Sequence, residues 1–254
     1  MALAGAGLRR VVAICVALLV AGCTHAISGT ARPAAGLKPN PLTGEVIKQV
    51  LLDEAVLANM LNQAFKGDPQ LPPRFGGPER LQPGLGDISP GECAGVSTMT
   101  VRSAYESAGV KNVARETWWT AGDSGKVISV AEAVVALPTV ADAATLFAKF
   151  TEQWKSCNGA TVTISGGALN FTDEVADVRL DNSVLAATVY VQATGASPGR
   201  RPQARAIGLR VNCLVEVEVA FFSVQSASDP GTGDPRTSAV DVARAIMEKI
   251  SARS

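Results

Sequence analysis

The chain has 254 residues and carries 23 lysines and arginines against 23 aspartates and glutamates, which gives a formal net charge of zero. With this balance, no basic stripe and only 5% aromatic residues, the composition excludes the electrostatic footprint of a nucleic-acid-binding protein. The 47% of hydrophobic residues is enough for a sizeable core in one domain of ordinary size.

Residues 1–22 have the pattern of an export signal. Arg9 and Arg10 precede an uncharged apolar run over residues 11–20, which matches the basic and hydrophobic regions of a signal peptide. The run is shorter than the roughly 20 residues that a membrane-spanning helix needs. We therefore expect this segment to be cleaved from the mature protein.

The signal ends in Val20, Ala21, Gly22 and Cys23, which resembles the lipobox of bacterial lipoproteins. The resemblance implies that the Cys23 thiol receives a diacylglyceryl group and that a peptidase cuts after Gly22. Stable anchoring takes more than one acyl chain, so we expect two or three chains to hold the protein on the outer face of the cell membrane. The alternative is an ordinary secretory signal with a chance cysteine.

Residues 23–42 are predicted to be a flexible tether, because prolines, glycines and small residues cannot bury enough apolar surface to fold alone. The remaining residues, 43–254, are predicted to form a single folded domain. They contain no internal repeat and no glycine-rich phosphate loop.

Three segments of this domain have the apolar period of amphipathic helices. They are residues 51–65, residues 138–157 and residues 237–253. Thr139 precedes Asp142 by three residues and Ser238 precedes Asp241 by three, so Thr139 and Ser238 are expected to cap the second and third helices. Residues 68–90, rich in proline and glycine, are predicted to be an irregular loop.

Residues 126–137 and 183–193 are predicted strands, and residues 209–222 alternate with period two. The last pattern predicts one strand, or two joined by a kink. Its apolar face would include Leu209 and Cys213, and its wet face would include Arg210, Asn212, Glu216 and Glu218. The predicted fold class is therefore α+β, an antiparallel sheet flanked by helices.

Besides Cys23, the mature chain has three cysteines, Cys93, Cys157 and Cys213. Export to an oxidising compartment favours one bridge and one free thiol. Cys213 lies on the apolar side of its predicted strand, where a small buried hydrophobe belongs. We therefore expect a disulfide between Cys93 and Cys157.

Several motifs occur in a characteristic order along the chain: SPGECAG at 89–95, SAYESAG at 103–109, ADAATLFAKFTEQWKSCNG at 141–159 and ARAIGLRVNCLVEVEVAFF at 204–222. The series resembles the extracellular sensor domain of PknH-type mycobacterial receptor kinases, which recurs on free-standing mycobacterial lipoproteins. Its most specific element is Trp154, Cys157 and Gly159.

The resemblance implies an α+β domain with a cleft for an unidentified ligand and no known catalysis. It also implies two disulfides, of which Cys93–Cys157 matches the first. For the second, this chain has Gln203 where a cysteine is expected and no cysteine near Phe222.

The sequence lacks the residues for several kinds of catalysis. Its single histidine, His25, lies two residues after Cys23, which excludes a Ser-His-Asp triad, a Cys-His dyad and a histidine-based zinc site in the domain. Asp173, Glu174 and Asp177 leave carboxylate chemistry as an alternative, but in a loop-like stretch we interpret them as a solvated face. We expect no enzyme activity, no cofactor and no metal.

Trp118 and Trp119 are the candidate ligand-binding residues, because adjacent aromatic rings beside a glycine turn can form an apolar cleft wall. If the segment is a strand, the two rings point to opposite faces and one enters the core.

Three functions remain open. The first is an envelope-anchored, sensor-like domain that captures a small ligand or cell-wall fragment in a cleft. The second is a docking protein that binds another envelope component without a small ligand, and the third is a carboxylate-dependent hydrolase. The resemblance and the position of the single histidine favour the first. The expected partners are the membrane, through Cys23, and an unidentified ligand or envelope component.

Overall fold

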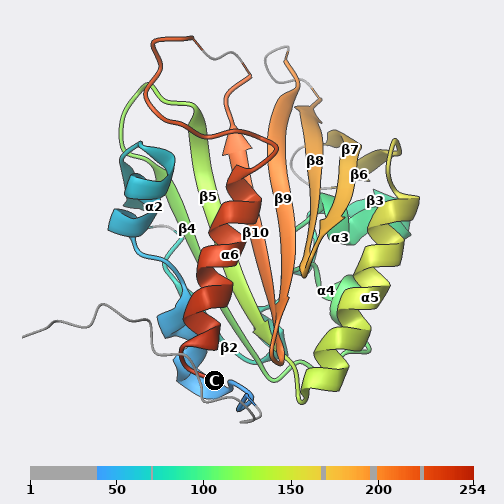
Figure 1. Ribbon diagram of the computed structural model, residues 1–254. Coiled ribbons are helices and arrows are strands. Elements are labelled where there is room, and N and C mark those ends of the chain that lie inside the picture. The colour runs from blue at the N-terminus through green and yellow to red at the C-terminus, as the bar shows by residue number, and fades with distance from the viewer. Residues whose placement is uncertain (1–38, 70, 167–169, 195–198, 224–225) are drawn as a thin grey trace, which may run out of the picture. The chain divides into compact units, whose positions relative to one another are not determined.

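An antiparallel sheet is the centre of the computed structural model, which describes residues 39–254 apart from residues 70, 167–169, 195–198 and 224–225 (Figure 1). Within the described residues the sheet has ten strands in the order β1-β4-β5-β10-β9-β8-β7-β6-β3, and β2 also pairs with β4. The strands are β1 Phe65–Gly67, β2 Arg74–Gly76, β3 Asp87–Ser89, β4 Asn112–Thr120, β5 Val127–Ala136, β6 Thr161–Ser165, β7 Phe171–Asp181, β8 Val184–Ala193, β9 Arg201–Arg210 and β10 Cys213–Phe221.

Helices cover both faces of this sheet, so the α+β class predicted from the sequence is confirmed. They are the α-helices α2 Glu54–Leu61, α3 Ala94–Ser97, α4 Arg102–Tyr105, α5 Val140–Ser156 and α6 Ser238–Ser251, and the 3₁₀ helices η1 Gly44–Val50, η2 Pro78–Arg80 and η3 Gly91–Cys93. One core lies between the sheet and α6 with η1 and α2. A second core lies between the opposite face and α5 with η3, α3 and α4.

The predicted signal peptide, Cys23 and the tether up to residue 38 lie outside the described residues. Leu42, which the sequence assigned to the end of the tether, is buried. Its backbone N–H donates to Oδ1 of Asn212 at 2.7 Å, and its carbonyl oxygen accepts from Nδ2 of Asn212 at 2.9 Å. The folded domain therefore includes this residue.

The alternating pattern of residues 209–222 turns out to be a hairpin and not a single or kinked strand. The chain reverses at Val211 and Asn212, between β9 and β10, and Val211 has a φ of 54°. Leu209 consequently faces the α5 side, opposite to Cys213, which packs on the α6 side. The tight turn preserves the period-two pattern, so the pattern could not show the reversal.

The predicted wet face is only partly exposed: Arg210 is exposed and Glu218 is half-buried, but the other two residues are buried. Asn212 is 0% exposed and Glu216 is 1% exposed. Asn212 is buried because its amide bonds the backbone of Leu42 and Leu137. Glu216 is buried because the segments around α3 and α4 cover its face of the sheet.

The helix predictions hold with changed boundaries. Thr139 caps α5, accepting the backbone N–H of Asp142 at 3.1 Å. Ser238 does not cap α6; its Oγ accepts the backbone N–H of Asp234 at 2.8 Å instead, and Thr237 precedes the helix without a side-chain cap. The first predicted helix, over residues 51–65, is confined to α2, because Asp53 caps its start, Asn62 ends it in the left-handed conformation and Phe65 starts β1.

Two segments predicted to be irregular contain strands. Residues 68–90 include β2, η2 and β3, and the segment with Asp173, Glu174 and Asp177 is part of β7. Asp177 has a φ of 54° and lies in the irregular pairing between Ala176 and Arg179. This interruption and the many charged residues conceal the strand alternation in the sequence.

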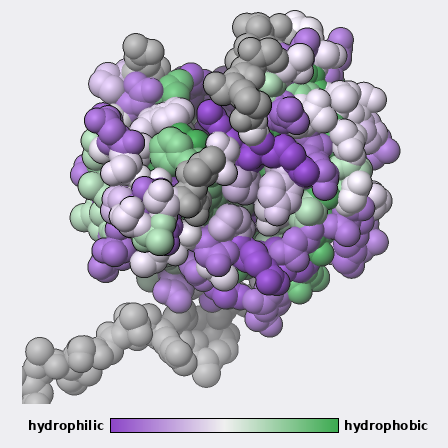
Figure 2. All heavy atoms as spheres, turned by 90° about the horizontal axis from the view of Figure 1, so that it is seen from above, coloured by the Kyte–Doolittle hydropathy of each residue, from purple (hydrophilic) through white to green (hydrophobic). Residues whose placement is uncertain are grey.

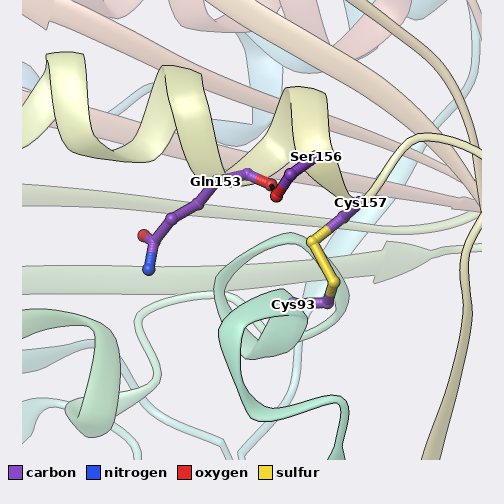
Figure 3. The surroundings of a disulfide bond; sticks show 4 residues. All are labelled: Cys93, Gln153, Ser156 and Cys157. Atoms are coloured by element: carbon purple, nitrogen blue, oxygen red, sulfur yellow. Dashed lines mark hydrogen bonds between the residues drawn. A yellow bond between two sulfur atoms is a disulfide. The ribbon is translucent and has the colours of Figure 1, made fainter.

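A disulfide between Cys93 and Cys157 joins η3 to the end of α5, with the two Cα atoms 5.8 Å apart (Figure 3). Beside it, Ser156 Oγ donates to the carbonyl oxygen of Gln153 at 2.8 Å in the last turn of the helix. Cys213 is a free thiol, and burial raises its pKa to about 12. The thiolate needed for reactivity is therefore absent at neutral pH.

Candidate functional site

A buried ion pair on the α5 side of the sheet is the first feature of the site. Nη2 of Arg205 on β9 lies 3.1 Å from Oε2 of Glu216 on β10, and both side chains are almost fully buried. The same Nη2 donates to the carbonyl oxygen of Gly95 at 3.3 Å, and Nη1 lies 3.5 Å from Oε2 of Glu218. The pair therefore connects two central strands to helix α3.

Glu216 also fixes the segment between α3 and α4. The backbone N–H of Thr100 lies 3.1 Å from both carboxylate oxygens of Glu216, and the hydroxyl of Tyr105 donates to Oε1. Burial raises the pKa of Glu216, while Arg205 and Tyr105 oppose that rise. Removing one partner of a buried ion pair costs about 3–5 kcal/mol, so this cluster holds the α3–α4 segment on the sheet.

Next to this cluster is a cavity of about 300 Å³, which we call the polar cavity. It lies between the α3–α4 segment, the loop before β3 and strands β4 and β6 to β10. Its polar lining residues are Gln82, Ser97, Thr98, Arg115, Asp173, Gln203 and Glu218, and its apolar lining residues are Leu85, Met99, Ile164, Phe171 and Val191. Gln203 occupies the position where the family resemblance leads one to expect a cysteine.

Two of the residues that line the polar cavity have a buried side-chain atom without a hydrogen-bond partner in the described part of the chain. These atoms are Nε of Arg115 and Oγ1 of Thr98. A buried polar atom without a partner costs about 1–3 kcal/mol, and most buried polar atoms in native proteins have one.

Two ionisable side chains that line the polar cavity, Asp173 and Arg115, have shifted pKa values. Burial raises the pKa of Asp173 to about 6 although the neighbouring Ser97 and Arg205 lower it. Burial lowers the pKa of Arg115, and the nearby Glu218 opposes this effect. Perturbed groups of this kind in a cavity are typical of functional sites.

A larger hollow of about 630 Å³ near α4 has no unpartnered buried polar atom among the described residues that line it. It is lined by Pro78, Leu81, Val110 and the charged residues Glu79, Arg102, Glu106 and Lys111, together with Tyr105. The charged residues around it are exposed, and the Tyr105 hydroxyl already donates to Glu216. We therefore take the smaller polar cavity as the candidate site.

The three clustered carboxylates of the sequence have separate environments. Asp173 is 2% exposed and lines the polar cavity, so its interpretation as part of a solvated face is wrong. Glu174, the next residue on β7, forms an ion pair with Arg200 at the surface. Asp177 pairs with Arg179 at 2.9 Å. Alternation along the strand separates Asp173 from Glu174, so these residues form no catalytic carboxylate pair.

Trp118 and Trp119 lie next to each other on β4, with side chains on opposite faces of the sheet. Trp118 packs against the core on the α6 side. Both rings are partly buried, and the residues that line the polar cavity include neither of them.

A second buried carboxylate, Glu132 on β5, lies on the α6 side of the sheet. The backbone N–H of Leu52 lies 3.0 and 3.1 Å from its two carboxylate oxygens. Burial raises the pKa of Glu132 to about 8, despite this hydrogen bond and the lowering effect of Trp118 and Lys249. Its place on the opposite face separates it from the polar cavity.

Sequence reasoning missed Arg205 and Arg115, and it assigned Asp173 and Glu216 to solvated faces. Of these residues, only Asp173 has apolar residues, Phe171 and Val175, at both neighbouring positions on the same side of its strand, which is a sign of a buried charge. Within the described residues, no group of three or more histidine, cysteine or acidic side chains is placed to hold a metal ion. In the same part of the chain, no helix has the length and apolar character needed to span a membrane.

Comparison with known proteins gives two kinds of match. A family model for the PknH-like extracellular domain matches residues 42–249. The crystal structure of the extracellular domain of PknH from Mycobacterium tuberculosis has 19% identity and a TM-score of 0.69, and the match covers 84% of this chain and 98% of that one. An uncharacterised protein from Mycobacterium smegmatis reaches only a TM-score of 0.36 at 12% identity, over 81% and 95% of the two chains. No curated protein matches the chain.

Proposed function

Since the chain belongs to the family of PknH-like extracellular domains, we propose that it is a non-catalytic, sensor-like domain that captures a small ligand or cell-wall fragment in the polar cavity. The single observation that carries this proposal is a cavity lined by polar and charged side chains, among them Asp173 and Arg115 with shifted pKa values. A ligand in the cavity could form hydrogen bonds with these side chains.

The surface favours ligand capture over docking to a large partner. The large exposed hydrophobic side chains of the described residues belong to separate helices, strands and loops; they are Val56, Leu71, Leu85, Val140 and Leu180. In the view from above the hydrophobic side chains form small, separate areas among hydrophilic ones (Figure 2). A docking face without a small ligand would instead have a broad exposed apolar patch.

The proposal includes a membrane anchor. The lipobox-like sequence before Cys23 and the extracellular type of the domain support acylation of that cysteine on the outer face of the cell membrane. Residues 24–41 would then separate the domain from the bilayer as a tether. Ligand capture would take place at the cell surface.

Native mass spectrometry of protein purified from its own envelope tests the proposal. Val191 lines the polar cavity, and the next residue on β8, Gln192, is exposed on the opposite face. We expect wild type and Gln192→Trp to carry the same non-covalent adduct and Val191→Trp to lose it. If wild type and both variants have the mass of the acylated chain alone, and no envelope extract raises their melting temperature, the proposal is wrong.

A further inference from the structure

We propose that the ligand of the polar cavity is the ring of a sugar, a neutral group with several hydroxyls. This inference rests on the proposed function and specifies its ligand. It comes from the kinds of hydrogen bond that the cavity offers, the balance of its charges and its apolar lining.

The lining of the cavity offers hydrogen bonds of both kinds. The carboxyl group of Asp173 can only accept while it is ionised, and the guanidinium group of Arg115 can only donate. A hydroxyl group both donates and accepts, so two hydroxyls on one ring can bond both groups. An ammonium group could donate only and a phosphate group would mainly accept, so each would leave one kind of group unpaired.

Charges of both signs surround the cavity and disfavour an ion. The carboxyl groups are those of Asp173, Glu216 and Glu218, and the guanidinium groups are those of Arg115, Arg205 and Arg74, which acts on Arg115. Arg205 is already paired with Glu216 and Glu218. The carboxylates would repel an anion, and the guanidinium groups would repel a cation. Burial strengthens both repulsions, because the interior screens charges less than water does. A neutral ligand avoids this cost.

The remaining lining fits the carbon face of a ring. Met99, Phe171 and Val191 present apolar surface to the same cavity, on which the C–H groups of a sugar can pack. The volume of about 300 Å³ is at the lower end of the range of small-molecule sites, roughly 300–1,000 Å³. One ring therefore fits, either as a free sugar or as the terminal unit of a longer glycan.

Saturation-transfer NMR and affinity titration of the full acylated protein test this inference, in a detergent without a sugar headgroup. The probes are methyl glycosides of common hexoses and pentoses, oligosaccharides ending in the same sugars, inorganic phosphate and 1,4-diaminobutane. We expect at least one sugar to bind, and phosphate and the diamine to give no signal. Tighter binding of the oligosaccharide than of the methyl glycoside would identify a glycan end as the natural source.

Two pairs of variants locate the binding. Asp173→Asn removes the carboxylate acceptor, and we expect about tenfold or greater loss of affinity, as for a hydrogen bond to a charged group. Glu174→Gln, on the next residue and the opposite face, should bind like wild type. Val191→Trp should abolish binding and Gln192→Trp should not, which keeps the test decisive if Asp173→Asn fails to fold.

Three results would overturn the inference. Sugar binding that survives both Asp173→Asn and Val191→Trp would place it elsewhere. Binding of phosphate or the diamine, but of no sugar, would show that the ligand is an ion and leave the proposed capture function intact. If no probe binds while wild-type protein from the envelope carries an adduct that Val191→Trp lacks, the sugar assignment alone is wrong. If no probe binds and wild-type protein from the envelope carries no such adduct either, the capture function itself is refuted.

Discussion

Replacing Glu132 by Gln should change how the stability of the domain depends on pH. The pKa of this buried carboxyl is about 8 in the folded protein against an ordinary value of 4.5. The folded state therefore binds the proton more tightly than the unfolded state. The stability that Glu132 contributes is complete below about pH 4.5 and is lost as the pH rises to about 8.

The size of this effect follows from the shift. One pKa unit corresponds to about 1.4 kcal/mol, so the free energy of unfolding should fall by up to about 5 kcal/mol across the window and by about 3 kcal/mol at pH 7. The amide of Glu132→Gln stays neutral, and its oxygen can still accept the backbone N–H of Leu52. The free energy of unfolding of the variant, relative to that of wild type, should therefore increase as the pH rises.

Urea unfolding followed by circular dichroism at half-unit steps from pH 4.5 to pH 8.5 measures this difference. Other buried carboxyls, such as Asp173, also titrate in this range, so the informative quantity is the difference between variant and wild type at each pH. Glu248→Gln, on an exposed position of α6, is the control and should give a constant difference. A Glu132→Gln difference that is equally constant with pH would refute the reasoning.

Three further predictions concern the cysteines and the tryptophans. Replacing Cys93 and Cys157 together by Ser should lower the free energy of unfolding by about 4 kcal/mol, because the bridge closes a loop with a sequence separation of 64; a loss below 1 kcal/mol in urea unfolding would contradict this. Cys23→Ser should abolish incorporation of labelled palmitate, and continued labelling would contradict the lipobox assignment. Trp118→Ala should cost about 3 kcal/mol, since its ring packs on the core, and Trp119→Ala should cost less. Equal losses in thermal or urea unfolding would show that both rings are core residues.

Much of the fold could be predicted from local patterns. The cap of Thr139 on Asp142 and the apolar stripe with Phe150 and Trp154 identify α5 from the sequence alone. The strands β5 and β8 are equally evident, because their residues are almost all apolar or small. Such elements can be predicted from the capping residues and the spacing of apolar residues within the segment itself, without knowledge of the rest of the chain.

The reversal in the β9–β10 hairpin could not be predicted in this way. Asn212 stabilises the turn through the backbone of Leu42 and Leu137, and these residues are 170 and 75 positions away in the sequence. The turn itself has no glycine, and Val211 takes the left-handed conformation there. Only the tertiary structure supplies the partners that make this conformation favourable.

The candidate site was hidden for a related reason. Glu216 alternates with valines and so resembles a solvent-facing residue, yet α3 and α4, which cover it, are only four residues long each. Helices this short have no detectable period in the sequence. Asp173 was misjudged because β7 carries charged residues along much of its length. The polar cavity therefore emerges only when four distant segments are placed together.

A crystal structure of the acylated protein purified from its own envelope would test the central claim, ligand capture in the polar cavity, most directly. The account predicts continuous electron density, larger than water, within hydrogen-bonding distance of Asp173 and Arg115 and packed against Phe171. A polar cavity closed by its own side chains, or a bound ligand located at another surface while the cavity holds only water, would contradict the account.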